Sequence, residues 1–290
     1  MVSTIYSIER DSDMWPQLLS ETPDKAQPQR LYIEGSLPPS DALIVGVVGT
    51  RRPTSYGRDV AHEIAFTLAS HGIVVASGLA IGIDATAHRA ALETKTPTVA
   101  ILGSGISRSV LYPPQNRDLA DKIIAAGGAI ISEYEPDARP EIWTFPARNR
   151  IIAGIAHAVI VVEAGEKSGA LITARFAAEY GRDVFAVPGA ITSDASRGTN
   201  ALIKQGATPI LSPNDILEAL GITSAPANGA RNDNVSPDEE KILAVLTEEL
   251  PIDHIIKQTG LAAHIVLAAT TELEIRGIIK GTGGGMYRRV

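Results

Sequence analysis

Cysteine is absent from the 290-residue chain. Disulfides, thiolate metal sites and a nucleophilic cysteine are therefore excluded. No apolar run approaches the roughly 20 residues that cross a bilayer. The first residues, MVSTIYSIERDSD, also lack the basic start and apolar core of a secretory signal. We therefore expect a soluble, cytoplasmic protein without a membrane partner.

Several cofactor and catalytic motifs are missing as well. The strand expected over Ile44–Val48 is not followed by a G-x-G-x-x-G turn, which disfavours NAD binding. The G-x-x-x-x-G-K-[ST] loop of many ATP-hydrolysing proteins is also missing. Ser104 lies in a glycine-rich strand end that lacks the G-x-S-x-G nucleophile elbow, and the histidines include no zinc-binding pair. The sequence predicts no cofactor, no metal and no enzymatic turnover.

Positive charge is also in short supply. The chain has 26 basic and 33 acidic side chains, a net charge of −7, which at first argues against a nucleic-acid partner. However, residues 1–43 carry 3 basic and 7 acidic side chains, whereas residues 44–220 carry 16 and 17. Because the central arginines are grouped in a few loops, a local cationic groove is compatible with this composition.

Short apolar runs alternate with amphipathic stretches from Leu43 onward, which is the pattern of βαβ units on a parallel sheet. We predict a Rossmann-like, doubly wound, mostly parallel α/β domain over residues 43–221. The expected strands are Ile44–Val48, Ile73–Ala76, Thr98–Leu102, Ala129–Ser132, Ala158–Val162, Val184–Ala186 and Thr208–Leu211. The expected helices are Gly57–Ser70, Ile83–Leu92, Asn116–Ala125, Asn149–Ile155, Ser168–Tyr180, Thr199–Lys204 and Asn214–Leu220.

The flanking segments have a different character. Residues 1–42 are expected to be an N-terminal extension, and residues 222–235, rich in Ala, Asn, Gly and Pro, a linker. Ser236-Pro237-Asp238-Glu239 then has the pattern of a capping box with proline at the first helical position. Further helices over 252–259 and 262–275 and a hairpin over 277–289 predict a winged-helix-like domain, residues 236–290.

A first group of candidate binding residues follows the first strand of the α/β domain. Gly49, Thr50, Arg51 and Arg52 stand at its carboxyl end, where doubly wound folds bind ligands. The alternative is that the two arginines only form ion pairs on the surface.

Ser77 and Gly78 follow the second strand, and glycine there allows a ligand to approach the backbone closely. Asp84 and His88 lie four residues apart and share one helix face. We interpret them as a helix cap and a packed histidine and not as a catalytic pair.

The most informative stretch runs from Phe145 to Thr173. Phe145 is suited to stack on a base, and Arg148 and Arg150 offer planar donor forks for phosphates, with Asn149 as a cap or polar contact.

Lys167, Ser168 and Gly169 stand at the start of the next helix, where free N–H groups and the helix dipole favour an anion. Together the two loops predict a phosphate-binding site for single-stranded nucleic acid. The alternative is that Glu163 and Glu166 pair with Arg148 and Arg150.

A series of short motifs follows in a fixed order along this domain. The motifs are Gly49-Thr50-Arg51, Ser77-Gly78-Leu79-Ala80-x-Gly82-Ile83-Asp84-x-x-Ala87-His88, Tyr112-Pro113-x-x-Asn116, Phe145-Pro146-x-Arg148-Asn149-Arg150-Ile151-Ile152-Ala153-Gly154, Glu163-Ala164, Ser168-Gly169-x-Leu171-Ile172-Thr173-Ala174, Val187-Pro188-Gly189 and Ser196-x-Gly198-x-Asn200-x-Leu202-Ile203. In this order they resemble the DprA/Smf family of bacterial DNA-processing proteins.

The resemblance implies a domain that binds and protects incoming single-stranded DNA, forms a homodimer and loads the RecA recombinase during natural transformation, without catalytic turnover. By this resemblance, Arg51 and Lys167 to Gly169 match positions of the family's phosphate-binding pocket. Phe145, Arg148 and Arg150 fall beside that pocket.

The chain departs from the family in three respects. Ile81 stands where many relatives have arginine, and Ala170 where many have serine, so a possible phosphate contact and a small polar group are lost. We expect the sterile-alpha-motif module of many relatives to be absent before residue 43. Residues 234–290 carry 6 basic and 8 acidic side chains, which favours protein contact over duplex binding.

Two other functions are weighed against this one. A LOG-like nucleotide phosphoribohydrolase or a nucleotide sensor would share the fold, but the LOG motif Pro-Gly-Gly-x-Gly-Thr-x-x-Glu is replaced by EAGEKSG at residues 163–169. A transcription regulator would use the helix at 262–275, which contains Glu272 and Glu274 and no Lys or Arg.

Overall fold

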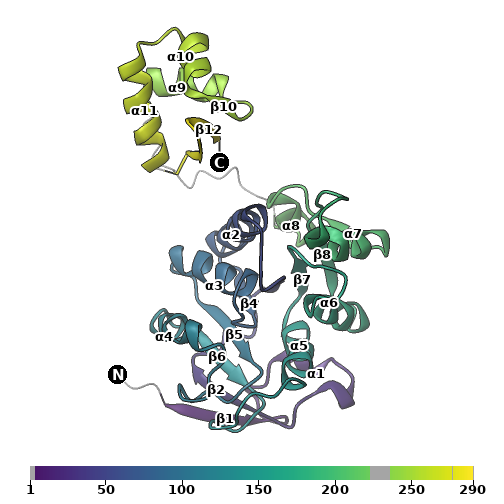
Figure 1. Cartoon of the computed structure of the whole chain (residues 1–290). Coiled ribbons are helices and arrows are strands. Elements are labelled where there is room, and N and C mark those ends of the chain that lie inside the picture. The colour runs from purple at the N-terminus through teal and green to yellow at the C-terminus, as the bar shows by residue number, and fades with distance from the viewer. Residues whose placement is uncertain (1–3, 223–235, 276, 290) are drawn as a thin grey trace. The chain divides into compact units, whose positions relative to one another are not determined.

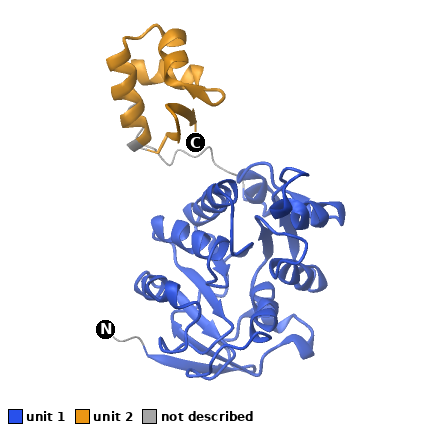
Figure 2. Ribbon diagram, viewed as in Figure 1, with its two compact units in different colours: residues 1–224 blue, residues 225–290 orange. Residues whose placement is uncertain are grey.

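The computed structural model describes residues 4–222, 236–275 and 277–289. It divides into two compact units, Met1–Ser224 and Ala225–Val290 (Figure 2). Apart from Ile222, the linker predicted over residues 222–235 lies outside the described residues. None of the described helices is both long and apolar enough to span a bilayer.

A nine-stranded sheet runs through the described part of the first unit, in the order β1-β2-β6-β5-β4-β3-β7-β8-β9 (Figure 1). The pairs β1–β2 and β2–β6 are antiparallel, and all other neighbouring pairs of this sheet are parallel. The strands are β1 (Ile5–Glu9), β2 (Arg30–Gly35), β3 (Ile44–Val48), β4 (Val74–Ser77), β5 (Thr98–Leu102), β6 (Ala129–Ser132), β7 (Ala158–Val161), β8 (Asp183–Ala186) and β9 (Thr208–Pro209).

Helices cover both faces of this sheet. Figure 1 shows α2, α3 and α4 on one face and α5 and α6 on the other. The helices are α1 (Gln17–Ser20), α2 (Ser55–Ser70), α3 (Ile83–Glu93), α4 (Arg117–Ala125), α5 (Thr144–Ile155), α6 (Ala170–Glu179), α7 (Arg197–Lys204) and α8 (Asn214–Ala219), with 3-10 turns at Asp24–Ala26, Pro114–Asn116 and Asp194–Ser196. The predicted doubly wound α/β fold is confirmed.

Each face buries its own apolar cluster. Ile64 and Leu68 of α2 pack with Val45 on one face, whereas Ile151 of α5 and Ala174 of α6 pack on the other. Side chains that alternate along a strand point to opposite faces, so nearly all-apolar strands are required between two helical layers.

The topology places a switch point between β3 and β7. From β3 the chain proceeds through β4 and β5 to β6, and then returns to β7 on the other side of β3. The N–H of Thr50 donates to the carbonyl of Glu163 over 2.7 Å, which ties the loops after β3 and β7 together. Doubly wound folds bind ligands at this kind of position.

The N-terminal extension contains two strands that the sequence pattern did not reveal. β1 and β2 pair antiparallel with each other, and β2 joins the edge strand β6. Leu31 and Ile33 of β2 are fully buried, so this segment completes the core. At the other edge, β9 is only two residues long, shorter than the predicted Thr208–Leu211.

Helix α5 begins earlier than predicted, at Thr144 instead of Asn149. Pro146 lies in its first turn, where proline is tolerated because the N–H groups there have no intrahelical acceptor. Phe145 and Arg148 are consequently helical residues and not loop residues.

The second unit is a small helical domain with a three-stranded sheet in the order β10-β12-β11. The capping box is confirmed: Glu239 N–H donates to Ser236 Oγ, and Ser236 N–H donates to the Glu239 carboxylate. The elements are α9 (Pro237–Val245), β10 (Leu250–Pro251), α10 (Ile252–Thr259), α11 (Ala263–Ile275), β11 (Ile279–Gly283) and β12 (Met286–Arg289). Ile242, Val266 and Leu273 form its core, and the arrangement is the predicted winged helix.

Candidate functional site

A cavity of about 670 Å³ lies at the carboxyl ends of β3 and β7, at the switch point of the sheet. The loops after these two strands form two of its walls, and α5 forms a third. Most of the predicted site residues line it, namely Gly49, Thr50, Arg51, Phe145, Arg148, Asn149, Lys167, Ser168 and Gly169. The structure thus brings the first and third predicted groups together.

The lining of this cavity is cationic although the chain is acidic. Its charged side chains are Arg51, Arg148 and Lys167 against the single carboxylate of Asp84. Asp84 is 6% exposed, and burial raises its pKa while the neighbouring Arg148 opposes that rise. The lining therefore has a net positive charge.

Arg51 is the exposed cation on the β3 side. Its guanidinium lies 5.4 Å from the centre of the Phe145 ring, within the range of a cation–π contact. The centres of the Tyr112 and Phe145 rings lie 5.4 Å apart, and the ring planes are at an angle of 52°. Arg51 forms no ion pair with any described carboxylate, so the alternative of a surface ion pair is wrong for this residue.

Lys167 is the exposed cation on the β7 side and precedes helix α6. Asn149 Nδ2 donates to the carbonyl of Gly169 over 3.0 Å, which fixes this loop against α5. α6 begins at Ala170, two residues later than predicted, and its first N–H groups face the region before the helix. The N–H groups of Ser168, Leu171 and Ile172 already donate to the carbonyls of Gly165, Ser168 and Gly169. An anion at this point therefore gains mainly from the helix dipole and from the charge of Lys167.

Arg148 has a different role from the phosphate fork that we predicted. It is 4% exposed, and its Nη1 donates to the carbonyl of Gly78 over 2.6 Å and also to the carbonyl of Ile101. Burial lowers the pKa of Arg148 to about 10, with Asp84 opposing this effect and Arg51 adding to it. The guanidinium remains charged at neutral pH and joins strand ends β4 and β5 to α5.

The other predicted residues also serve the fold. Arg150 forms a partly buried ion pair with Glu133 and does not line the cavity. Ser77 is fully buried and donates to the carbonyl of Val47 over 2.6 Å. A Cβ on Gly78 would lie 2.3 Å from the Arg148 guanidinium, so glycine leaves the room that this guanidinium occupies. Arg52 is exposed but lies outside the cavity lining.

The alternative to the phosphate site, in which Glu163 and Glu166 pair with arginines of α5, is wrong. Glu163 accepts hydrogen bonds from the N–H and the hydroxyl of Thr54, at 2.9 and 2.6 Å, and is 2% exposed. Glu166 lies 3.8 Å from Arg197 instead. Neither glutamate neutralises the cavity.

Asp84 and His88 are both buried in α3. Asp84 accepts from the N–H of Gly78 at 3.1 Å and is inside the helix, so it is not the N-cap that we predicted. His88 Nδ1 contacts Thr98 Oγ1 at 2.8 Å. Because the Thr98 hydroxyl donates to Val75, Nδ1 must carry the proton. The prediction of a packed histidine is confirmed.

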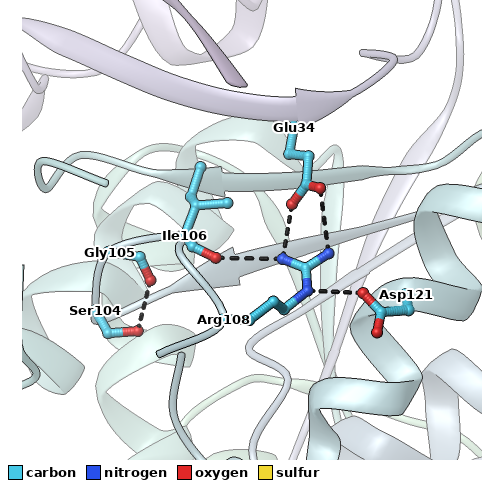
Figure 3. Close-up of polar contacts among 6 residues, drawn as sticks. All are labelled: Glu34, Ser104, Gly105, Ile106, Arg108 and Asp121. Atoms are coloured by element: carbon cyan, nitrogen blue, oxygen red, sulfur yellow. Dashed lines mark hydrogen bonds and ion pairs between the residues drawn. The ribbon is translucent and has the colours of Figure 1, made fainter. Parts of the chain in front are cut away.

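The loop between β5 and α4 supports the aromatic wall of the cavity. Figure 3 shows the Arg108 guanidinium between Glu34 of β2 and Asp121 of α4, with a further contact to the carbonyl of Ile106. The Arg108–Glu34 contacts are 2.7 and 3.2 Å, the paired geometry that favours arginine over lysine. This anchor lies four residues before Tyr112.

The model of the family described as DNA recombination-mediator protein A matches residues 7–221, and that of the DprA winged helix domain matches residues 211–285. The chain belongs to the DprA/Smf family. It is 38% identical to Protein Smf of Escherichia coli over 98% of this chain and 77% of the relative. It is 41% identical to the DNA processing protein DprA of Bacillus subtilis, over 74% and 71%.

Solved structures of DprA proteins have the same fold. The Streptococcus pneumoniae protein matches with a TM-score of 0.68 and 40% identity, covering 74% of each chain. The Helicobacter pylori protein, whose structure is described by its single-stranded DNA binding mode, matches with a TM-score of 0.66 and 32% identity, over 76% of this chain and 96% of that one.

Some lining residues were absent from the predicted site. Tyr112 is 42% exposed and Ile142 is 93% exposed, and both line the cavity. Tyr112 stands in one of the ordered family motifs and follows a strand, which was a usable signal. Ile142 has no sequence pattern around it that indicates its position.

Proposed function

We propose that this DprA-family chain binds single-stranded DNA in the cavity at the switch point. Arg51 and Lys167 contact the phosphates, together with the hydroxyl of Ser168 and the backbone N–H of Gly169. The observation that carries this proposal is the cationic lining in a chain of net charge −7, since the two exposed cations face a cavity whose one carboxylate is buried. The DNA-binding description of the Helicobacter pylori structure supports the same class of ligand.

Binding of this kind is sequence-tolerant, because phosphate contacts position a strand without distinguishing its bases. Phe145 and Tyr112 add aromatic surface on which unstacked bases rest. We leave Ser77 and Arg150 out of the direct contacts, since their side chains hold other parts of the fold.

We further propose that the chain acts without catalytic turnover, as a homodimer that protects incoming DNA and delivers it to the RecA recombinase. The family description as a recombination mediator supports this role. The positions of Asp84 and His88 also support it, because His88 does not line the cavity and the Asp84 carboxylate accepts the N–H of Gly78.

The test is fluorescence anisotropy of a labelled oligo-dT with four variants of the full chain. Arg51→Ala and Lys167→Ala each lose a charge-assisted contact, so we expect binding to weaken by about 1–3 kcal/mol. Arg52→Ala removes the neighbouring exposed arginine outside the cavity, and Lys122→Ala removes an exposed lysine of α4.

We expect Arg52→Ala to weaken binding less than Arg51→Ala, and Lys122→Ala to leave it unchanged. Equal affinity of the wild type and both cavity variants would refute this site. Equal losses in all four variants would show only a general dependence on charge, and would refute the cavity as the place of binding.

A further inference from the structure

The segment between β6 and α5, residues 133–143, borders the cationic cavity at the switch point through Ile142. Ile142 is 93% exposed, and the next residue, Trp143, is 59% exposed. Tyr112 follows β5, the neighbour of β6 in the sheet, and lines the same cavity. Exposed apolar side chains that gather beside a cavity mark a surface that contacts a ligand or partner. The cations Arg51 and Lys167, in contrast, follow β3 and β7.

Trp143 is restrained by two contacts of its ring. Its indole Nε1–H donates to the Glu141 carboxylate. The ring centres of Trp143 and Tyr134 lie 6.0 Å apart, with the planes at 80°. More than half of the surface of Trp143 nevertheless remains open. A side chain that is already ordered loses little conformational freedom when a ligand packs on it, so this indole is a preorganised aromatic surface.

The charge of this segment is opposite to that of the cavity lining. Its exposed charged residues are three acids and one base, Glu135, Asp137, Glu141 and Arg139. Carboxylates repel phosphates, whereas Arg51 and Lys167 attract them. A DNA strand in the cavity therefore turns its phosphates toward the loops after β3 and β7. The part of the strand that faces Trp143 is its bases.

We propose that Trp143 stacks on a base of the single strand whose phosphates lie in the cationic cavity, and that Ile142 packs against the same nucleotide. This inference rests on the proposed function and adds the side of the cavity that receives the bases. Every base has a ring face, so stacking on Trp143 tolerates any sequence. A duplex hides these faces between its base pairs, so the same surface favours unpaired strands.

The first test uses the fact that the chain has two tryptophans. Trp15 is 8% exposed and packs in an apolar cluster, so it is replaced in the variant Trp15→Phe of the full chain. All tryptophan emission of this variant then comes from Trp143. Stacking on a base quenches indole emission, so saturating oligo-dT should lower it, while anisotropy of the labelled oligomer reports binding. Binding without a change in emission would overturn this inference alone, and absence of binding would overturn the proposed function with it.

A second test separates stacking from a structural role of Trp143. The wild type and Trp143→Leu are each titrated with oligo-dT and with an oligomer of the same length built from stable abasic tetrahydrofuran nucleotides. Trp143→Leu should bind oligo-dT roughly 5-fold more weakly than the wild type does, the lower end of the range for one stacked base. Both proteins should bind the abasic oligomer equally. Trp143→Phe keeps an aromatic ring and should recover part of the loss. Equal losses on both oligomers would show that Trp143 only supports the fold, and would overturn the proposal.

The salt dependence of binding gives an independent readout. Stacking releases no counterions, so the slope of log affinity against log salt should be the same in Trp143→Leu as in the wild type. The matched control is Phe66→Leu, since Phe66 is a 40% exposed aromatic in the second half of α2 and lies outside the cavity lining. This control should bind oligo-dT as the wild type does. A flatter slope in Trp143→Leu, or an equal loss of affinity in Phe66→Leu, would contradict a stacked base at Trp143.

Discussion

His88 shows how a single buried side chain makes stability depend on pH. Burial, reinforced by the positive charge of Arg148, lowers its pKa to about 3 from the ordinary value of 6.5. As the pH falls below about 6.5 the unfolded chain takes up a proton at this histidine, but the folded chain does not until about pH 3. The free energy of unfolding therefore decreases in this window by about 1.4 kcal/mol per pH unit from His88 alone.

The variant His88→Gln lacks this group and keeps a side chain able to donate to Thr98. Between pH 7.5 and 5.0, urea denaturation should show that the wild type loses about 2 kcal/mol more stability than the variant. The raised pKa of Asp84 acts in the opposite direction, since its folded carboxyl holds a proton more tightly than the unfolded one. Both proteins contain Asp84, so its effect largely cancels in the difference. Parallel stability curves would contradict the assignment.

The arginines show what residue types alone can predict. Arg51 and Arg148 were both predicted to lie at the binding site, and both line the cavity. The sequence could not distinguish the exposed one from the buried one, because burial of Arg148 depends on carbonyl groups at Gly78 and Ile101, far away in the chain. Arg150 pairs with Glu133, which is 17 residues away in the chain, and not with Glu163 or Glu166.

At the scale of elements, the Arg108 anchor connects the unpredicted strand β2 to the wall of the cationic cavity (Figure 3). Glu34 is 8% exposed, so removing its partner leaves a carboxylate largely desolvated. We expect Arg108→Ala to lower the free energy of unfolding by about 1–3 kcal/mol and to weaken oligo-dT binding, because the loop that carries Tyr112 loses its support. Arg108→Lys keeps the charge but loses the paired contact, and should be intermediate.

The matched control is Arg30→Ala on the same strand. Arg30 pairs with Glu9, and their side chains are 45% and 51% exposed. Exposed ion pairs contribute about 0–1 kcal/mol, so this variant should change stability little. Thermal unfolding and anisotropy of both variants test the anchor. A loss of stability in Arg108→Ala with unchanged DNA binding would show that β2 does not support the site.

Elements with a strong pattern were predicted well, and those that depend on distant contacts were not. β3, β5 and β6 have the predicted bounds because continuous apolar runs define them. β1 and β2 were not predicted, because they are joined by about 20 residues and pair antiparallel at the edge of a parallel sheet. α5 begins at Thr144, ahead of the predicted start at Asn149, and has Pro146 in its first turn.

At the scale of the whole molecule, the cationic lining belongs to a chain whose net charge is negative. The acidic flanks lie in residues 1–43 and 221–290, and every lining residue of the cationic cavity belongs to the first unit. A chain that ends at Gly221 has its own sheet and apolar clusters. We therefore expect it to keep the affinity of the full chain for single-stranded DNA.

The salt dependence of binding separates the phosphate contacts from this background. For single strands, the slope of log affinity against log salt is about −0.7 for each phosphate neutralised. Arg51→Ala and Lys167→Ala should each make the slope less steep by about 0.7, whereas removal of residues 222–290 should leave it unchanged. These slopes come from oligo-dT titrations between low and physiological salt. A shallower slope in the shortened chain would place cationic contacts in the winged helix. In that domain, α11 has no Lys or Arg from Ala263 to Ile275, whereas β12 contains Arg288 and Arg289.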